Sequence, residues 1–90
     1  MMRAVLDGGS VDSREALHRA LKDALSLPDW YGNNLDALFD CLTDLHEPTE
    51  LTVLNARKLR ESLGGYAQAL LHVLRDSERE NEKLVVHWEE

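Results

Sequence analysis

Three aspartates, Asp36, Asp40 and Asp44, are spaced four residues apart, so that on a helix they would share one face. Carboxylates arranged in this way could bind a hard cation such as Mg²⁺, act as an acid and base pair, or meet cationic groups of a partner. Each like-charged pair at this spacing destabilises a helix by roughly 0.2–0.5 kcal/mol, so local stability does not explain the stripe. A solvated face on an acidic protein is the alternative, and the pattern alone leaves both interpretations open.

The sequence around these aspartates supplies few of the other groups that catalysis or metal binding requires. No lysine or histidine lies directly beside Asp36 or Asp40, and an exposed helix face lacks the cleft that shifts a carboxyl pKa. Cys41 is the only cysteine, expected to be half-buried, and the four histidines show no zinc-ligand spacing. We therefore predict no metal, no cofactor and no catalytic residue. A metal-dependent hydrolase that uses Asp36 and Asp40 is the minor alternative.

A loop and a helix must position the acidic stripe. Pro28 should end the preceding helix, because it disfavours α-helical backbone at the residue before it, and Gly32 is expected to form a turn that few side chains tolerate. Asn33 or Asn34 can cap the following helix. The buried face of that helix is predicted from apolar residues at i, i+3, i+4 and i+7, which are Leu35, Leu38, Phe39 and Leu42.

Two aromatic residues, Trp30 and Tyr31, lie in this loop. Aromatic side chains next to charge are typical of interface hot spots, although loop aromatics also pack into the core. We expect at least one of these two rings to be buried. Trp88, near the end of the chain, is expected to pack in the core or along a sheet edge.

The pattern of apolar runs and turn residues predicts a single α/β domain over residues 1–90. Short apolar segments predict strands at 3–7, 51–54 and 84–88, and helical periodicity predicts about four helices between them. Asp12 or Ser13 is expected to cap the first helix and Asn55 the third. Because parallel strands need crossover connections, the order β-α-α-β-α-α-β predicts a small three-stranded parallel sheet packed with helices. The sequence does not determine the strand order.

Composition indicates the kind of partner. The net charge is −7 and the basic residues are scattered, which disfavours direct nucleic-acid binding and favours a basic protein. The chain starts without a signal-peptide pattern and contains no run of about 18 apolar residues, so we expect a cytoplasmic protein that does not bind a membrane.

The segment from Trp30 to Thr43 resembles, without a gap, the barstar family of intracellular inhibitors of secreted ribonucleases. Weaker matches are Leu17-His18, the segment 25–28 and the segment 73–76. The resemblance implies a barstar-like fold in which a helix and the loop before it enter the nuclease active site. It also implies that one aspartate replaces a substrate phosphate among catalytic Arg, Lys and His side chains, and Asp40 is the matching residue here.

The resemblance carries contact roles onto further residues of this chain: Trp30, Gly32, Asn34, Asp36, Phe39, Thr43 and Asp76. Several positions depart from the family pattern, since Asp44-Leu45 replaces Gly-Trp, Phe39 replaces a tryptophan and Trp30 replaces a tyrosine. Asp76 stands in place of a glutamate, and a second cysteine is absent. Asp44 extends the acidic stripe and joins the candidate partner-binding residues. Because specificity is a difference between partners, these changes bear on which nuclease is recognised.

The expected function is inhibition of a small, basic, secreted ribonuclease of the barnase type, which gives the producing cell immunity. We expect a 1:1 complex, a free protein that is monomeric, and no enzymatic activity. The alternative from another class is an acidic adaptor for a basic protein that is not a nuclease.

Overall fold

The chain folds into three strands and four α-helices, and the computed structural model describes all residues from 1 to 90. The strands are β1 (Met2–Asp7), β2 (Thr49–Leu54) and β3 (Leu84–Trp88). The helices are α1 (Arg14–Leu25), α2 (Leu35–Thr43), α3 (Ala56–Leu63) and α4 (Gly65–Glu80), with a short 3-10 helix, η1 (Gly8–Ser10), after β1. The predicted α/β class and order of elements are confirmed. None of the helices combines the length and the apolar character needed to cross a membrane.

The sheet is parallel throughout, with the strands in the order β1-β2-β3. β1 pairs with β2 from Met2 opposite Thr49 onward, and β2 pairs with β3 from Thr49 opposite Leu84 onward. Each connection passes through two helices, as parallel pairing requires. The second strand begins two residues earlier than predicted, directly after Pro48.

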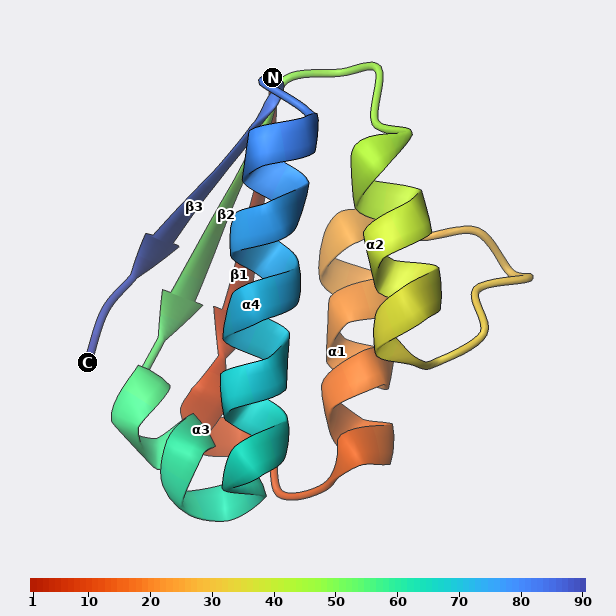
Figure 1. Ribbon diagram of the computed structural model, residues 1–90. Coiled ribbons are helices and arrows are strands. Elements are labelled where there is room, and N and C mark those ends of the chain that lie inside the picture. The colour runs from red at the N-terminus through yellow and green to blue at the C-terminus, as the bar shows by residue number, and fades with distance from the viewer.

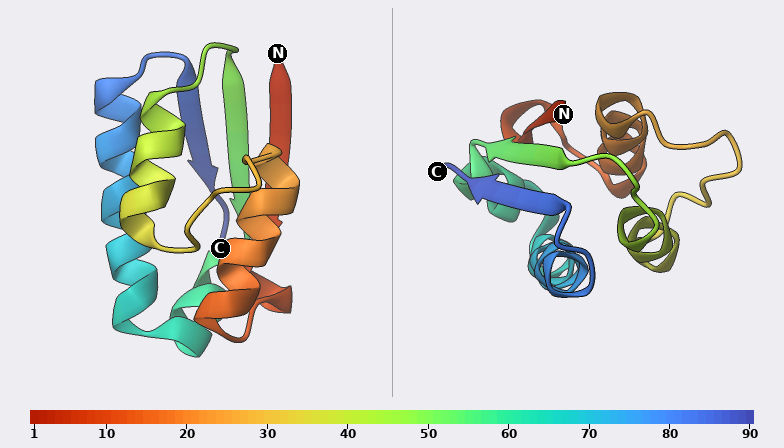
Figure 2. Two further views of the ribbon diagram at one scale, coloured as in Figure 1. Left: turned by 90° about the vertical axis from the view of Figure 1, so that its right-hand side faces the viewer. Right: turned by 90° about the horizontal axis from the view of Figure 1, so that it is seen from above.

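The helices gather on one face of the sheet (Figure 1, Figure 2). Within β1, Ala4 and Leu6 are buried on the helical side, whereas Arg3 and Val5 are exposed on the other. α1 packs on β1 and α4 packs on β3, but α2 packs mainly on α4. The side of α2 that carries Asp36, Asp40 and Asp44 is exposed to solvent.

Side-chain hydrogen bonds define the starts of α1 and α2. Ser13 Oγ accepts from the Ala16 N–H (3.1 Å), as one of the predicted capping options. The predicted side-chain cap at Asn55 is wrong. Asn55 has a left-handed backbone (φ 53°), and its amide donates to the Asp7 carboxylate (2.8 Å) rather than capping α3. This bond joins the ends of β1 and β2, and together with the Gly9 N–H it lowers the pKa of the Asp7 carboxyl.

Gly64 separates α3 from α4 with φ 56° and ψ −127°, a conformation that L side chains rarely adopt. Gly64→Ala should therefore lower the free energy of unfolding by about 1–3 kcal/mol, measured by denaturant titration. Gly65→Ala is the matched control, because an added Cβ at either glycine meets no atom within 4 Å. At Gly65 no positive φ is required, so alanine should stabilise α4 by about 0.5–1 kcal/mol. Equal effects at both positions would contradict a backbone origin.

Candidate partner-binding surface

The segment 26–34 joins α1 to α2 and is held by backbone hydrogen bonds at its start. The Leu27 N–H donates to the Lys22 carbonyl (3.0 Å), and the Tyr31 N–H donates to the Pro28 carbonyl (2.9 Å). α1 ends at Leu25, in agreement with the expected effect of Pro28. We call residues 26–34 the binding loop.

The positive φ in the second half of the binding loop lies at Asn33 (φ 55°) and not at Gly32. The prediction that Gly32 forms a turn that few side chains tolerate is therefore wrong. Asparagine adopts left-handed backbone more readily than other residues with a side chain, which explains the difference. Gly32 instead accepts a hydrogen bond on its carbonyl from Asn34 Nδ2 (3.2 Å), and a Cβ at Gly32 would lie 3.2 Å from that nitrogen. Asn34 Oδ1 in turn accepts from the Ala37 N–H (2.8 Å) and caps α2.

The two loop aromatics have opposite environments. Tyr31 is 4% exposed and belongs to the hydrophobic core, so the expected burial of at least one ring is confirmed. Trp30 is 76% exposed, and its side chain has no aromatic or hydrogen-bond partner within the protein. The binding loop therefore presents a large aromatic surface to solvent directly beside an anchored neighbour.

The acidic stripe lies on the exposed side of α2. Asp36, Asp40 and Asp44 are all exposed, and none of them forms an ion pair. Asp36 lies in the first turn, where the helix dipole favours a negative charge, whereas Asp40 and Asp44 lie toward the end of the helix, where it does not. The helix dipole thus disfavours the charges of Asp40 and Asp44, and all three carboxylates remain available to an external cation.

The other side of α2 fills the core with Leu38, Cys41 and Leu42. Cys41 was expected to be half-buried but is buried, because the side of α2 on which it lies packs mainly on α4. Burial raises the pKa of the Cys41 thiol, and the nearby charges of Asp40 and Asp44 raise it further. The thiol is therefore held in its neutral, unreactive form.

Phe39 and Thr43 lie half-buried at the edge of the stripe. The Thr43 hydroxyl donates back to the Phe39 carbonyl (2.8 Å), so its hydrogen is already used within α2. Asp76 comes from α4 and forms an ion pair with Arg79 one turn later, unlike the unpaired carboxylates of α2. A partner must therefore compete with Arg79 for Asp76.

The C-terminal ends of α2 and α4 are tied together. The Asn81 side-chain amide donates to the carbonyls of Leu42 (3.0 Å) and Leu45 (3.1 Å). Figure 1 shows the two helices side by side and running in the same direction. The structure therefore brings the helix that carries Asp76 against the acidic helix, although the two are far apart in the sequence.

His18 is a residue that the sequence prediction missed. Its ring is 1% exposed, with Nδ1 at 2.5 Å from the Tyr31 hydroxyl and Nε2 at 2.6 Å from the Tyr66 hydroxyl. A periodicity signal was present, because His18 lies three and seven residues before the buried Leu21 and Leu25. Because histidine is polar, it was not assigned to the buried face of α1.

Burial lowers the pKa of His18 below its usual value of 6.5, against a smaller raising effect of Glu15. The unfolded chain therefore binds a proton at higher pH than the folded protein does. We expect the contribution of His18 to the free energy of unfolding to be constant above about pH 6.5 and to decrease below it. Urea titrations between about pH 5 and about pH 8 measure this slope. His18→Asn should reduce it, because the variant has no titratable side chain at this position.

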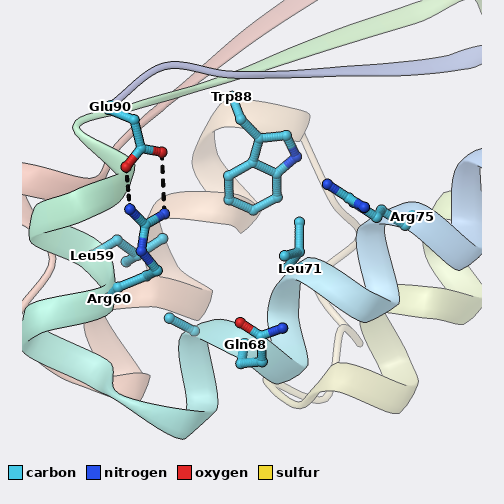
Figure 3. Close-up of a pocket in the computed structure, with 8 residues that line it drawn as sticks. Leu59, Arg60, Gln68, Leu71, Arg75, Trp88 and Glu90 are labelled. Atoms are coloured by element: carbon cyan, nitrogen blue, oxygen red, sulfur yellow. Dashed lines mark hydrogen bonds and ion pairs between the residues drawn. The ribbon is translucent and has the colours of Figure 1, made fainter.

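Figure 3 shows a groove between α3, α4 and β3. The half-buried side chains of Trp88 and Leu71 line it. Trp88 thus packs at a sheet edge, as predicted. An ion pair between Arg60 and Glu90 lies at the rim of this groove. A second groove, along α1, brings together cationic side chains that look scattered in the sequence, namely Arg14, Arg19 and Lys22.

Neither Asp36 nor Asp40, the residues of the hydrolase hypothesis, lines any groove of the protein. No three side chains of His, Cys, Asp or Glu converge in an arrangement that could hold a metal ion. The carboxylates of α2 instead lie exposed on one side of the helix, and the exposed Trp30 lies in the loop that precedes it.

Comparison with known proteins agrees with this architecture. The family model described as "Barstar (barnase inhibitor)" matches residues 1–89. The chain is also 41% identical over 81 residues, or 89% of each chain, to a protein of Bacillus subtilis (strain 168) named "Putative ribonuclease inhibitor YrdF". The family match extends over all the strands and helices of the fold. The chain therefore belongs to the barstar family.

Proposed function

We propose that this protein inhibits a small basic ribonuclease by placing the exposed face of α2 and the binding loop in its active site. The observation that carries the proposal is the set of three exposed, unpaired carboxylates on α2, which follows the loop that exposes Trp30. A ribonuclease must bind RNA phosphates through cationic side chains, and a carboxylate can satisfy those groups without being cleaved. Asp40 is the proposed phosphate mimic, because the resemblance to the barstar family matches it to the aspartate that takes the place of a substrate phosphate.

The rigidity of α2 favours this role. Its first turn is capped by Asn34, and its inner side is packed through Leu38 and Leu42. A carboxylate on such a helix loses little further conformational freedom on binding, so more of the interaction energy appears as affinity. The proposed contact surface consists of Asp40 and the residues around it: Trp30, Gly32, Asn34, Asp36, Phe39, Thr43, Asp44 and Asp76.

Charge adds to the rate of binding. A net charge of −7 attracts a basic nuclease over a distance, which raises the association rate and makes it sensitive to salt. We infer a 1:1 complex, because one acidic face can fill one active site. An inhibitor of this kind would protect, from inside, a cell that makes and exports the nuclease.

The experiment is a titration of a small secreted ribonuclease of the barnase type, with RNA cleavage followed as the protein is added. We expect inhibition that is complete at one equivalent, with an association rate that is lower at about 0.3 M than at about 0.05 M salt. Cleavage that continues at a large excess of inhibitor would contradict inhibition of this class of nuclease. Capture of a different basic protein, salt-sensitive and dependent on Asp40, would instead favour the adaptor hypothesis.

A further inference from the structure

We propose that His18 is a positioning residue for partner binding, which holds the binding loop in its binding conformation through the hydroxyl of Tyr31. The proposal rests on the proposed function, because it concerns the same surface. His18 lies behind that surface and touches no partner itself.

The geometry joins three elements at one buried ring. His18 belongs to α1, Tyr31 to the binding loop and Tyr66 to the first turn of α4. Both ring nitrogens of His18 are within hydrogen-bond distance of a tyrosine hydroxyl, at 2.5 Å and 2.6 Å. The ring centroids of the two tyrosines lie 5.7 Å and 5.9 Å from that of His18. The side chain of Tyr31 is thus fixed in position by a hydrogen bond as well as by packing.

Tyr31 is the one residue that ties this part of the loop to the core, since the other contacts here are local hydrogen bonds and an exposed ion pair between Asp29 and Lys22. Of residues 29–34, only Tyr31 is buried, whereas its neighbours Trp30 and Gly32 are exposed. The direction in which Trp30 points therefore depends on how firmly the next residue is held. A lost bond between Tyr31 and His18 should loosen the loop more than it loosens α2, which has its own cap and core contacts.

The protonation state of His18 determines the pattern of donors. A neutral ring has one N–H donor and one acceptor nitrogen, so one tyrosine hydroxyl donates to it and the other accepts. A protonated ring donates from both nitrogens, so both hydroxyls must accept. In the tautomer with the hydrogen on Nε2, the buried Tyr31 is the hydroxyl that donates to the neutral ring, and it must then find another acceptor for its own hydrogen. The other charged or titratable groups near the network are Arg14, Glu15, Arg19, Lys22 and Cys41. Protonation of His18 should thus weaken the anchor of the loop.

The two sides of His18 differ in their access to water, which provides a matched pair of variants. Tyr66 is half-buried, lines the open groove along α1, and has the Arg14 guanidinium 4.3 Å from its ring centroid. Water can replace its hydroxyl in a Tyr66→Phe variant. Tyr31 is buried, so Tyr31→Phe leaves His18 Nδ1 without a partner. Each substitution removes a single oxygen atom and leaves the ring in place.

The first experiment compares these two variants by amide hydrogen exchange of residues 29–34 in the free protein and by inhibition of the ribonuclease. For Tyr31→Phe we expect exchange in the loop to be about 10-fold faster and the inhibition constant to rise roughly 5- to 10-fold, the size expected for one lost hydrogen bond. For Tyr66→Phe both should change by less than about twofold. Equal loop protection in Tyr31→Phe and the wild type would overturn the positioning role. A wild type that inhibits no ribonuclease while Tyr31→Phe loosens the loop would overturn the proposed function and retain the anchor.

The second experiment uses pH to separate positioning from general stability. The inhibition constants of the wild type and His18→Asn are measured between about pH 5 and about pH 8, well below the unfolding temperature. Their ratio cancels the titration of the nuclease's own groups. We expect the wild type to lose its advantage as the pH falls through the lowered pKa of His18, where the ring takes up a proton. A ratio that stays constant over this range would overturn the proposal.

Discussion

Asp40→Ala is expected to weaken binding of the ribonuclease by about 3–4 kcal/mol, or roughly 100- to 1,000-fold in Kd. The substitution removes the carboxylate that would meet the cationic groups of the active site, and those groups would then be buried without a partner. The free energy of unfolding should stay constant or rise slightly, because like-charged contacts with Asp36 and Asp44 disappear, each of about 0.2–0.5 kcal/mol. Isothermal titration calorimetry and denaturant unfolding of the same samples measure the two quantities.

Glu61→Ala is the matched control for Asp40→Ala. Glu61 is an exposed helical carboxylate on α3, which packs on α4 and η1 and not on the acidic helix. Its removal changes the net charge by the same amount, so it should alter the association rate slightly and the dissociation rate not at all. Equal losses of affinity in both variants would reduce the role of Asp40 to a contribution to net charge.

Leu42→Ala is expected to have the opposite profile, although Leu42 lies only two residues after Asp40. Its side chain is 0% exposed on the inner side of α2, so truncation leaves a cavity in the core. The free energy of unfolding should fall by about 2–5 kcal/mol. The unfolding temperature should fall by roughly 10–30 °C for a domain of this size. At a temperature where the variant is still folded, its affinity for the nuclease should remain within about 10-fold of the wild type, because the acidic face is retained.

Leu42→Met is the control for the loss of volume, since it keeps a flexible apolar side chain of similar size and should destabilise by less than about 1.5 kcal/mol. Differential scanning calorimetry of the two variants separates the cavity from other effects. A Leu42→Ala variant with wild-type stability would show that α2 is not held to the core through this side chain.

The sequence by itself determined the elements and the chemistry of the acidic helix. Local rules suffice there, because an amphipathic period places the leucines on one side and Asp36, Asp40 and Asp44 on the other. Pro28 marks the end of the preceding helix and Asn34 the start of α2. Alternation of strands and helix pairs likewise predicted a parallel sheet. The gap-free resemblance from Trp30 to Thr43 indicated the family before any contact was known.

Only the tertiary structure decided what lies behind that surface. The strand order, the bond between Asn55 and Asp7, and the contact of α4 with the acidic helix join residues that are far apart in the chain, and no local preference encodes such pairs. His18 is the clearest case. A histidine among leucines has no favourable local reason to be buried, and its burial is compensated by two hydroxyls that arrive from 13 and 48 residues away. The residues exposed on the candidate binding surface thus follow from local sequence, whereas the contacts that hold the loop and α2 in place depend on the tertiary fold.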